Sequence, residues 1–336
     1  MGLLKWLGLR RPNTWEPPTI IDKLLFDSPL RWLMASLYSL ILFLRGRPFH
    51  VPTDKPPIRV VCLSDTHDTI LPPHKIPNGD LLIHCGDLTV DGSRRAIQRQ
   101  LDWLASLPHR HKVFVCGNHD SWFDPNVRAK DDEQSLDFKG MVYLENSAVT
   151  LEFKGGRKLN LYGSGAVPDC GEGPDSNFAF QYDRRLHPWA GTVPDETDVL
   201  VTHTPPAYHR DLGGVGCTGL LEEVWRIKPK LHVFGHVHWG HGREPVYFDE
   251  CQRAYESLMA RPRKGGPLRD LLLPLSSGAA GAWRDAFAVL WYGLNSVIWK
   301  WVMLGPGSNN GGLFVNAAVM YGNTGRATHP VTVVDL

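Results

Sequence analysis

The stretch IRVVCLSDTH, residues 58–67, sets the pattern that decides the fold. Ile58 to Leu63 is a mostly apolar run rich in β-branched residues, and the polar motif Asp65-Thr66-His67 comes almost directly after it. An apolar run of this length, closed by a polar motif, is typical of a strand that is buried on both faces. The stretch therefore predicts a buried strand that delivers a carboxylate and an imidazole at its carboxyl end.

The same pattern of an apolar run closed by a polar motif recurs four times along the chain. The runs are Asp80–Cys85, Lys112–Cys116, Val199–Thr202 and Leu231–Phe234. The motifs that close them are Gly86-Asp87, Gly117-Asn118-His119-Asp120, Thr202-His203 and Gly235-His236-Val237-His238. Active sites of open α/β sheets form at the carboxyl ends of the strands. We therefore expect the five motifs to meet at one edge.

The remaining elements predict an α/β fold with two sheets. The spacing of apolar residues predicts helices over Arg94–Leu107 and Leu220–Ile227. Two apolar runs flank Gly155-Gly156 and predict a hairpin. Near the end of the sequence, Leu313–Val319 and Val331–Val334 have the character of strands, which implies a second sheet packed on the first.

The side chains of the five motifs are those that bind metal ions. They supply several imidazoles, the carboxylates of Asp65 and Asp87, and the amide of Asn118. Oxygen and nitrogen ligands in this mixture suit hard to borderline divalent metals. Two such ions about 3.5–4 Å apart would lower the pKa of a bridging water and clamp the oxygens of a phosphate. The set predicts a two-metal phosphoester hydrolase in which a metal-bridging hydroxide attacks phosphorus.

The order and spacing of the motifs suggest roles for single residues. Asp87 is the expected bridge between the two metals, because a carboxylate has two oxygens whereas an imidazole cannot bridge. Gly86 and Gly117 permit tight backbone paths beside the ions. His236 and His238 flank one residue, so strand alternation would place them on the same side, where they serve neighbouring metals.

Composition limits the class of protein. The 36 Lys and Arg residues nearly balance 35 Asp and Glu, giving a formal net charge of +1, which argues against a nucleic-acid-binding protein. No CxxC pair occurs among the six cysteines. Cys62, Cys85 and Cys116 lie within the apolar runs, so we expect reduced core thiols and a cytoplasmic protein.

Residues 1–56 differ in composition from the rest of the chain and are interpreted as an appendage to a domain that covers residues 57–336. Within them, Trp32–Leu44 predicts an apolar helix flanked by Arg31, Arg45 and Arg47. Such a helix is about 20 Å long, short of the roughly 30 Å core of a bilayer. Three interpretations stay open: a helix packed on the protein, a helix at a membrane interface, and a spanning or signal segment.

A stretch over about residues 240–307 has a different character and predicts a helical insertion. Apolar residues recur there at helical spacing, namely Phe287, Leu290, Trp291, Leu294, Ile298 and Trp301. Trp283, Trp299 and Lys300 add the aromatic and basic mixture found where membrane meets water. One interpretation is a helix packed on the domain or on the amino-terminal helix. The other is peripheral membrane contact through residues 32–44 and 283–304.

The set DTH, GD, GNHD, TH and GHVH resembles the calcineurin-like metallophosphoesterase superfamily, from about Ile58 to Val334 with a break at the insertion. Further segments resemble the metallophosphoesterase-domain-containing (239-type) branch. They are Thr202–Pro206, Asn177–Tyr182, Gly216-Cys217, Leu220-Leu221 and Leu231–His236.

This resemblance implies a four-layer α/β/β/α sandwich and two divalent metal ions, of Mn, Fe, Zn or Mg. One metal would be held by Asp65, His67, Asp87 and His238, and the second by Asp87, Asn118, His203 and His236. His119 would be the unligated histidine that stabilises charge or protonates the leaving oxygen, with Asp120 or Asp91 orienting it. The branch slightly favours phosphodiesters over phosphomonoesters as the substrate.

Three other functions are alternatives to this hydrolase. A metal-binding scaffold could keep the fold and lose turnover, although every ligand position is filled and His119 is present. A protein phosphatase is disfavoured because Gly117-Asn118-His119-Asp120 continues to Ser121-Trp122 rather than to an arginine. A membrane-associated lipid-phosphoester hydrolase would account for the two apolar segments.

Overall fold

The computed structural model describes residues 3–128, 135–170, 178–261, 277–303 and 311–336. By their contacts, the residues fall into two compact units. The sheet unit comprises residues 50–211, 216–243 and 314–336, and the helical unit comprises residues 1–49, 212–215 and 244–313. Of the predicted insertion, residues 262–276 and 304–307 lie outside the described residues, as does Asn177.

The first sheet of the sheet unit has the strand order β13-β1-β2-β3-β4. β1 (Arg59–Leu63), β2 (Leu81–Cys85), β3 (His111–Val115) and β4 (Val142–Tyr143) run parallel, and β13 (Thr332–Asp335) is antiparallel to β1. β1 and β2 are buried on both faces except at Arg59, as continuous apolar runs require. The predicted strands at the first three motifs are therefore confirmed.

The second sheet has the strand order β11-β12-β10-β9-β6-β5. Its strands are β11 (Gly242–Val246), β12 (Gly312–Asn316), β10 (Leu231–Phe234), β9 (Val199–Thr202), β6 (Lys158–Ser164) and β5 (Ser147–Glu152). β10, β9 and β6 are parallel, and β5 and β6 form the predicted hairpin around the short helix η4 (Lys154–Gly156). The division between the two units falls within β11 and β12. The short strands β7 (Val167–Pro168) and β8 (Gln181–Tyr182) form a separate pair.

One strand joins a different sheet from the one that the sequence implies. Both carboxyl-terminal strands are expected in the second sheet, but β13 pairs with β1 of the first, with Val60 opposite Val334. The alternation of a short strand shows that it has a buried face, but its partner is set by contacts far away in the sequence.

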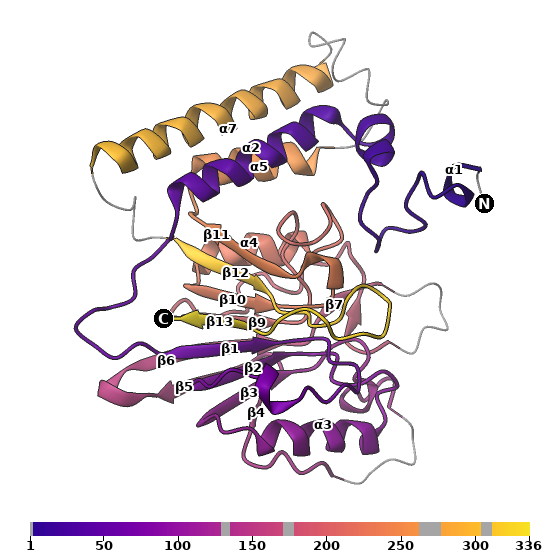
Figure 1. Ribbon diagram of the computed structural model, residues 1–336, viewed down its shortest axis with the longest axis vertical. Helices are drawn as coiled ribbons and strands as arrows, with labels where there is room; N and C mark the ends of the chain where they lie inside the picture. The colour runs from indigo at the N-terminus through magenta and orange to yellow at the C-terminus, as the bar shows by residue number, and fades with distance from the viewer. Residues whose placement is uncertain (1–2, 129–134, 171–177, 262–276, 304–310) are drawn as a thin grey trace. The chain divides into compact units, whose positions relative to one another are not determined.

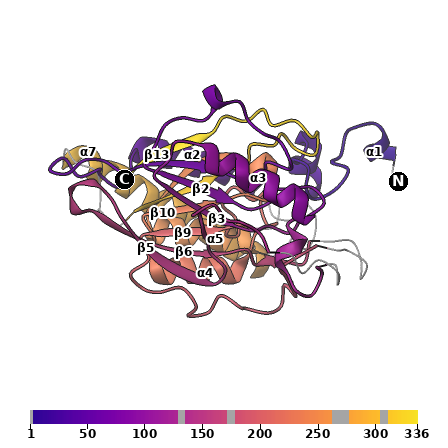
Figure 2. The same cartoon turned by 90° about the horizontal axis from the view of Figure 1, so that it is seen from below.

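Helices cover the outer faces of both sheets in the sheet unit (Figure 2). The figure shows α3 (Arg94–Ser106), then the first sheet, then the second sheet, then α4 (Thr218–Ile227). This is the expected α/β/β/α order. Besides η4, three short 3-10 helices lie in the connecting loops of the described residues: η2 (Pro73–Lys75), η3 (Ser121–Phe123) and η5 (His238–Gly240).

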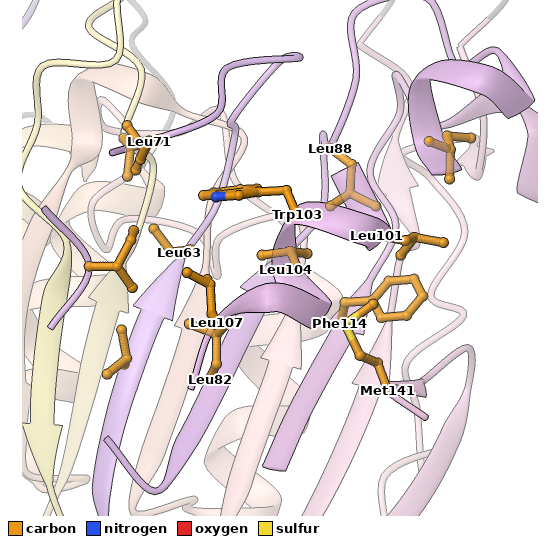
Figure 3. Packing of buried hydrophobic residues seen from close by; sticks show 14 of the residues in the cluster. Leu63, Leu71, Leu82, Leu88, Leu101, Trp103, Leu104, Leu107, Phe114 and Met141 are labelled. Carbon is orange, nitrogen blue, oxygen red and sulfur yellow. The ribbon is translucent and has the colours of Figure 1, made fainter. Parts of the chain in front are cut away.

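The packing of α3 explains why its sequence is amphipathic. The helix begins after Ser93, whose Oγ accepts a hydrogen bond from Ala96 N. Its apolar face packs against side chains of the first sheet in one buried cluster (Figure 3). Leu101 of α3 is fully buried there, so its truncation to alanine is expected to cost about 2–5 kcal/mol.

The helical unit contains α2 (Pro29–Arg45), α5 (Glu250–Ala260) and α7 (Ser277–Val302), with α1 (Leu3–Trp6) and a π-helical turn, η1 (Asp22–Phe26), near the amino terminus (Figure 1). The three longer helices share one buried cluster, which includes Met34 and Ile41 of α2, Leu258 of α5 and Val289 of α7. The apolar segment at residues 32–44 therefore packs on the helices of the predicted insertion. Among the described residues, no helix combines the length and the apolar character needed to cross a membrane.

Candidate metal centre

The loops that come after β1, β2, β3, β9 and β10 bring the predicted ligands together within the sheet unit. Asp65, Asp87, Asn118 and His203 are buried, and His236 is half-buried. Burying so many polar and ionisable groups is costly unless they are paired or bind metal ions. Their arrangement is therefore the first sign of a functional site.

The backbone of these loops is unusual at the ligand positions. Asp65, His67, Asp87 and His236 all have φ between 42° and 65°, the left-handed region that residues other than glycine rarely adopt. Such conformations cost of order 1–3 kcal/mol each and persist only where the surrounding structure imposes them. The surrounding structure therefore imposes a strained backbone at these positions, and this backbone orients the four ligand side chains.

Glycines permit the close approach of these loops. A Cβ atom at Gly117 would lie 2.2 Å from Asp87 Oδ1, and one at Gly235 would lie 2.2 Å from Asp65 Oδ2. Gly86 has φ +91°, and a Cβ there would lie 2.6 Å from Gly117 N. The tight backbone paths expected at Gly86 and Gly117 are confirmed, whereas the close approach at Gly235 was not predicted.

The first group of ligands consists of Asp65, His67 and His238, which could hold a metal ion. His67 Nε2 lies 3.2 Å from His238 Nε2, which in turn lies 3.2 Å from Asp65 Oδ1. His238 Nδ1 donates to the carbonyl of Gly322 at 2.7 Å. In the neutral ring, therefore, the lone pair of Nε2 faces the group, as metal-bound histidines require.

The second group consists of Asp87, His203 and His236. His203 Nε2 lies 3.4 Å from Asp87 Oδ2 and 3.1 Å from Asn118 Oδ1. His203 Nδ1 donates to the carbonyl of Cys85 at 2.7 Å, which again leaves Nε2 as the ligand atom. Asn118 therefore lies where an amide oxygen could join this group.

Asp87 belongs to the second group and also contacts a histidine of the first. Its Oδ2 lies 3.6 Å from His67 Nε2 and 3.4 Å from His203 Nε2. Its Oδ1 accepts a hydrogen bond from His119 N at 2.9 Å, which fixes the carboxylate. The carboxylate predicted to bridge two metals is thus the one that contacts histidines of both groups.

The electrostatics of the centre favour bound cations. Burial disfavours the charged form of Asp87, but the charges of His203 and His119 hold its pKa well below its ordinary value. Burial likewise opposes charge on His203, yet Asp87 raises the pKa of that ring to about 9. For His236, burial and the neighbouring His203 lower the pKa to about 3, so this ring is neutral. The carboxylates stay ionised and attract cations, whether these are protons or metals.

His119 lies beside both groups. Its ring is 4.9 Å from that of His67 and 4.9 Å from that of Phe178, and Nδ1 lies 2.8 Å from the carbonyl of Val90. Because a carbonyl can only accept, Nδ1 carries a proton and Nε2 is the atom available for chemistry. His67, Asp87 and His119 also form a third group that could hold a metal, so the geometry allows His119 to act as a metal ligand or as an unligated proton donor.

The two carboxylates expected to orient His119 have other partners. Asp120 is buried and accepts hydrogen bonds from the amides of Leu88, Thr89 and Gly117. Burial and the nearby charge of Asp87 raise the pKa of Asp120 to about 6. Asp91 accepts from Ser93 N instead. In the structure Asp120 ties the β2 and β3 loops together, and a carbonyl orients the ring of His119.

The argument from strand alternation for His236 and His238 was wrong. β10 ends at Phe234, and both histidines lie beyond it, His236 with φ 65° and His238 in η5. They nevertheless join neighbouring groups, because the left-handed turn redirects the chain between them. The carbonyls of Cys85, Val90 and Gly322 were missed as well, since every residue has a carbonyl and no sequence pattern marks these three.

The donor set fits divalent metal ions. It combines two carboxylates, an amide and four imidazoles, and further hydrogen bonds to carbonyls hold the rings of His119, His203 and His238 in place. Such a mixture of oxygen and nitrogen ligands suits Mn, Fe, Zn or Mg and not a thiophilic metal.

Comparison with known proteins points to one family. The family model for calcineurin-like phosphoesterases matches residues 58–240. This range includes all seven predicted metal ligands. Metallophosphoesterase domain-containing protein 1 of Homo sapiens is 35% identical over 225 residues, covering 57% of this chain and 65% of that protein. A UPF0046 protein of Caenorhabditis elegans is 36% identical over 211 residues, covering 57% of this chain and 67% of that protein.

Of two further matches, one covers a small part of the matched protein and the other is more distant in sequence. A protein of Emericella nidulans named probable rhamnogalacturonate lyase C is 43% identical over 206 residues, but the match spans 60% of this chain and only 19% of that protein. A solved structure, TT1561 of Thermus thermophilus, covers 57% of this chain and 86% of that protein, with a TM-score of 0.40 and 17% identity.

Proposed function

The chain belongs to the calcineurin-like phosphoesterase family, and we propose that it hydrolyses phosphoesters with two divalent metal ions held by its seven ligands. One ion would be bound by Asp65, His67, Asp87 and His238. The other would be bound by Asp87, Asn118, His203 and His236. Phosphodiesters are the favoured substrates, on the strength of the resemblance to the metallophosphoesterase-domain-containing branch.

The observation that carries this proposal is the position of Asp87 between the two groups of ligands. Its Oδ2 lies within 3.6 Å of a histidine nitrogen from each group. A single metal would need only one of these groups, whereas a shared carboxylate is what a pair of ions requires. Two ions held there would lower the pKa of bound water and neutralise charge on the phosphate.

His119 has the geometry of the proton donor in this reaction. The hydrogen bond from Nδ1 to Val90 holds the ring in place, so that the imidazolium presents its Nε2 proton. As the new bond to phosphorus forms, the bond to the leaving oxygen breaks and that oxygen takes the proton from His119. The products are an alcohol and a phosphate with one ester bond fewer. A positioned acid of this kind contributes about 10²–10⁴-fold.

Hydrolysis of two model esters tests the proposal. Bis-p-nitrophenyl phosphate and p-nitrophenyl phosphate would be compared with added Mn²⁺, and bound metal would be measured by elemental analysis. We expect metal-dependent turnover that is faster with the diester, and two metals per chain. Asp87→Asn should lose bound metal and nearly all turnover, because the bridge loses its charge.

His119→Ala is expected to keep both metals and to lose about 10²–10⁴-fold in turnover. Asp91→Asn is the matched control, because this exposed carboxylate accepts its hydrogen bond from Ser93 N; turnover and metal content should stay as in the wild type. Wild-type protein that binds no metal would overturn the proposal. Two bound metals without turnover of either ester would favour the scaffold interpretation.

A further inference from the structure

Helix α7 of the helical unit exposes its large side chains and buries its small ones. The residues that face the shared core are Ala282, Asp285, Ala286, Val289 and Gly293. The exposed residues include the aromatic stripe, which we define as Trp283, Phe287, Leu290, Trp291, Leu294, Ile298 and Trp301. These seven recur at steps of three, four or one residue and so lie along one face of the helix. This is the reverse of the usual pattern for a helix of a water-soluble unit.

The aromatic stripe is large. Its four aromatic side chains are between 40% and 66% exposed. At about 200 Å² for each aromatic side chain, they leave on the order of 450 Å² of apolar surface in water. Patches above a few hundred Å² are rare on monomers and mark sites of interaction. Three aliphatic residues add to this area.

Helix α2 adds further exposed apolar side chains beside α7. Lys300 Nζ of α7 donates to the carbonyl of Leu44 at the end of α2. A Cβ at Gly293 would lie 2.4 Å from Ile41 Cδ1, so the two helices approach closely. Phe43 of α2 is 79% exposed, and Leu40 is about half exposed.

The charges on these two helices are almost all positive. Asp285 is the one acidic residue in the sequences of α2 and α7. It is buried and forms an ion pair with Arg261 at 2.6 Å. Arg284 of α7 also pairs with Asp285, at 3.6 Å, but its side chain is 78% exposed. Arg47, just beyond α2, is exposed as well. The apolar surface is therefore flanked by cations.

These features favour a lipid surface over a second copy of the chain. A symmetric dimer through this face would bring Arg284 and Arg47 of two copies together without an exposed acidic partner on either helix, whereas anionic headgroups complement them. Tryptophan beside basic side chains is typical of the membrane interface. The 26 residues of α7 extend about 39 Å, and no described helix is suited to cross the bilayer, so the helix would lie in its plane.

We propose that the aromatic stripe of α7, together with Phe43 and Leu40 of α2, anchors the helical unit in the surface of anionic phospholipid membranes. The apolar side chains enter the boundary between headgroups and acyl chains, while Arg284 and Arg47 stay among the headgroups. This binding is independent of the metal centre and of the hydrolysis proposed above.

Sedimentation with vesicles tests the anchor. The full chain would be mixed with vesicles of phosphatidylcholine alone, or with vesicles in which about a third of the lipid is phosphatidylserine. Tryptophan fluorescence would be recorded on the same samples. We expect binding that is stronger with phosphatidylserine, with a blue shift of the emission. The double variant Phe287→Glu, Leu294→Glu should lose binding by at least about tenfold, because two charges would have to enter the apolar boundary.

Two further variants separate the apolar contribution from the charge. Arg284→Glu should weaken binding only to the anionic vesicles, by at least about fivefold. Arg253→Glu on α5 makes the same change of charge away from the stripe, at an exposed position, and should bind as the wild type does. Helix circular dichroism during urea unfolding reports whether each variant keeps its helical unit folded.

Two results would overturn the anchor. Wild-type protein that does not bind either kind of vesicle would exclude it. Protein that is dimeric in light scattering, and that becomes monomeric in the double variant without any difference in vesicle binding, would show that a second copy covers the stripe.

Discussion

The sheet unit buries its charges, whereas the helical unit exposes its aromatic side chains. At the metal centre, Asp65, Asp87 and His203 are shielded from water, and the two carboxylates lie on strained loops. On α7, Trp291 and Trp301 are more than half exposed. Each arrangement costs free energy in the isolated chain. For each we have proposed a partner outside the chain, namely metal ions for the sheet unit and a membrane surface for the helical unit.

Our two binding proposals rest on this difference between the units. Buried carboxylates that stay ionised need cations close by, and the imidazoles beside them match divalent metals. Exposed tryptophans flanked by arginines carry our proposal of a membrane anchor, because an apolar boundary with anionic groups would complement them. The same chain therefore departs from the usual distribution of polar and apolar residues in two opposite ways.

Removal of the metals should produce the largest difference in stability between the two units. A chelator should abolish hydrolysis and lower the stability of the sheet unit by about 3 kcal/mol, as expected for a ligand present at a hundred times its dissociation constant. Hydrogen exchange followed by mass spectrometry would then show faster exchange in β2 and β9. Peptides of α2 and α5 should exchange as before. Equal acceleration in both units would contradict the comparison.

Gly117→Ala should damage the metal centre without changing a ligand. The added Cβ would lie 2.2 Å from Asp87 Oδ1 and 2.6 Å from Asp87 N, and a backbone atom cannot move aside easily. We expect hydrolysis to fall by about 100-fold, equivalent to roughly 3 kcal/mol, with weaker metal binding. Gly140→Asn is the control, because nothing lies near that glycine and asparagine tolerates its φ of +76°. Full activity of Gly117→Ala would show that the loops are looser than the structure indicates.

Gly293→Leu and Leu294→Ala should distinguish the two faces of α7. The leucine would collide with Ile41 of α2, and overpacking of this kind costs about 1–3 kcal/mol. Leu294 is exposed, so its truncation should change stability by at most about 0.5 kcal/mol. Urea unfolding followed by helix circular dichroism would measure both. A larger loss for Leu294→Ala would mean that the stripe is packed within the protein.

The strands and helices of the sheet unit agree closely with the sequence pattern. β9 and β10 have the predicted bounds, and β1 and β2 begin one residue later than expected. These elements are predictable because burial on both faces leaves a continuous apolar run, and the motifs mark where each run ends. The pairing of β13 was not predictable, because nothing local selects β1 as its neighbour.

The ligand types were predictable, but the groups that orient them were not. A carboxylate or an imidazole is visible in the sequence wherever it occurs. The carbonyl of Val90, which holds His119, is not, and the sequence suggested Asp120 or Asp91 instead. For α7, the periodicity of the aromatic residues defines one face of a helix but leaves open whether that face meets the protein or its surroundings.

By itself, the sequence determined the order of strands and motifs and the ligand types that a divalent metal needs. These properties depend on residue type and spacing, which are local. Only the tertiary structure decided that Asp87 touches histidines of both groups, that Asp120 ties two loops together, and that α7 turns its small residues inward. These properties depend on contacts between segments far apart in the chain, where close packing leaves room for one arrangement.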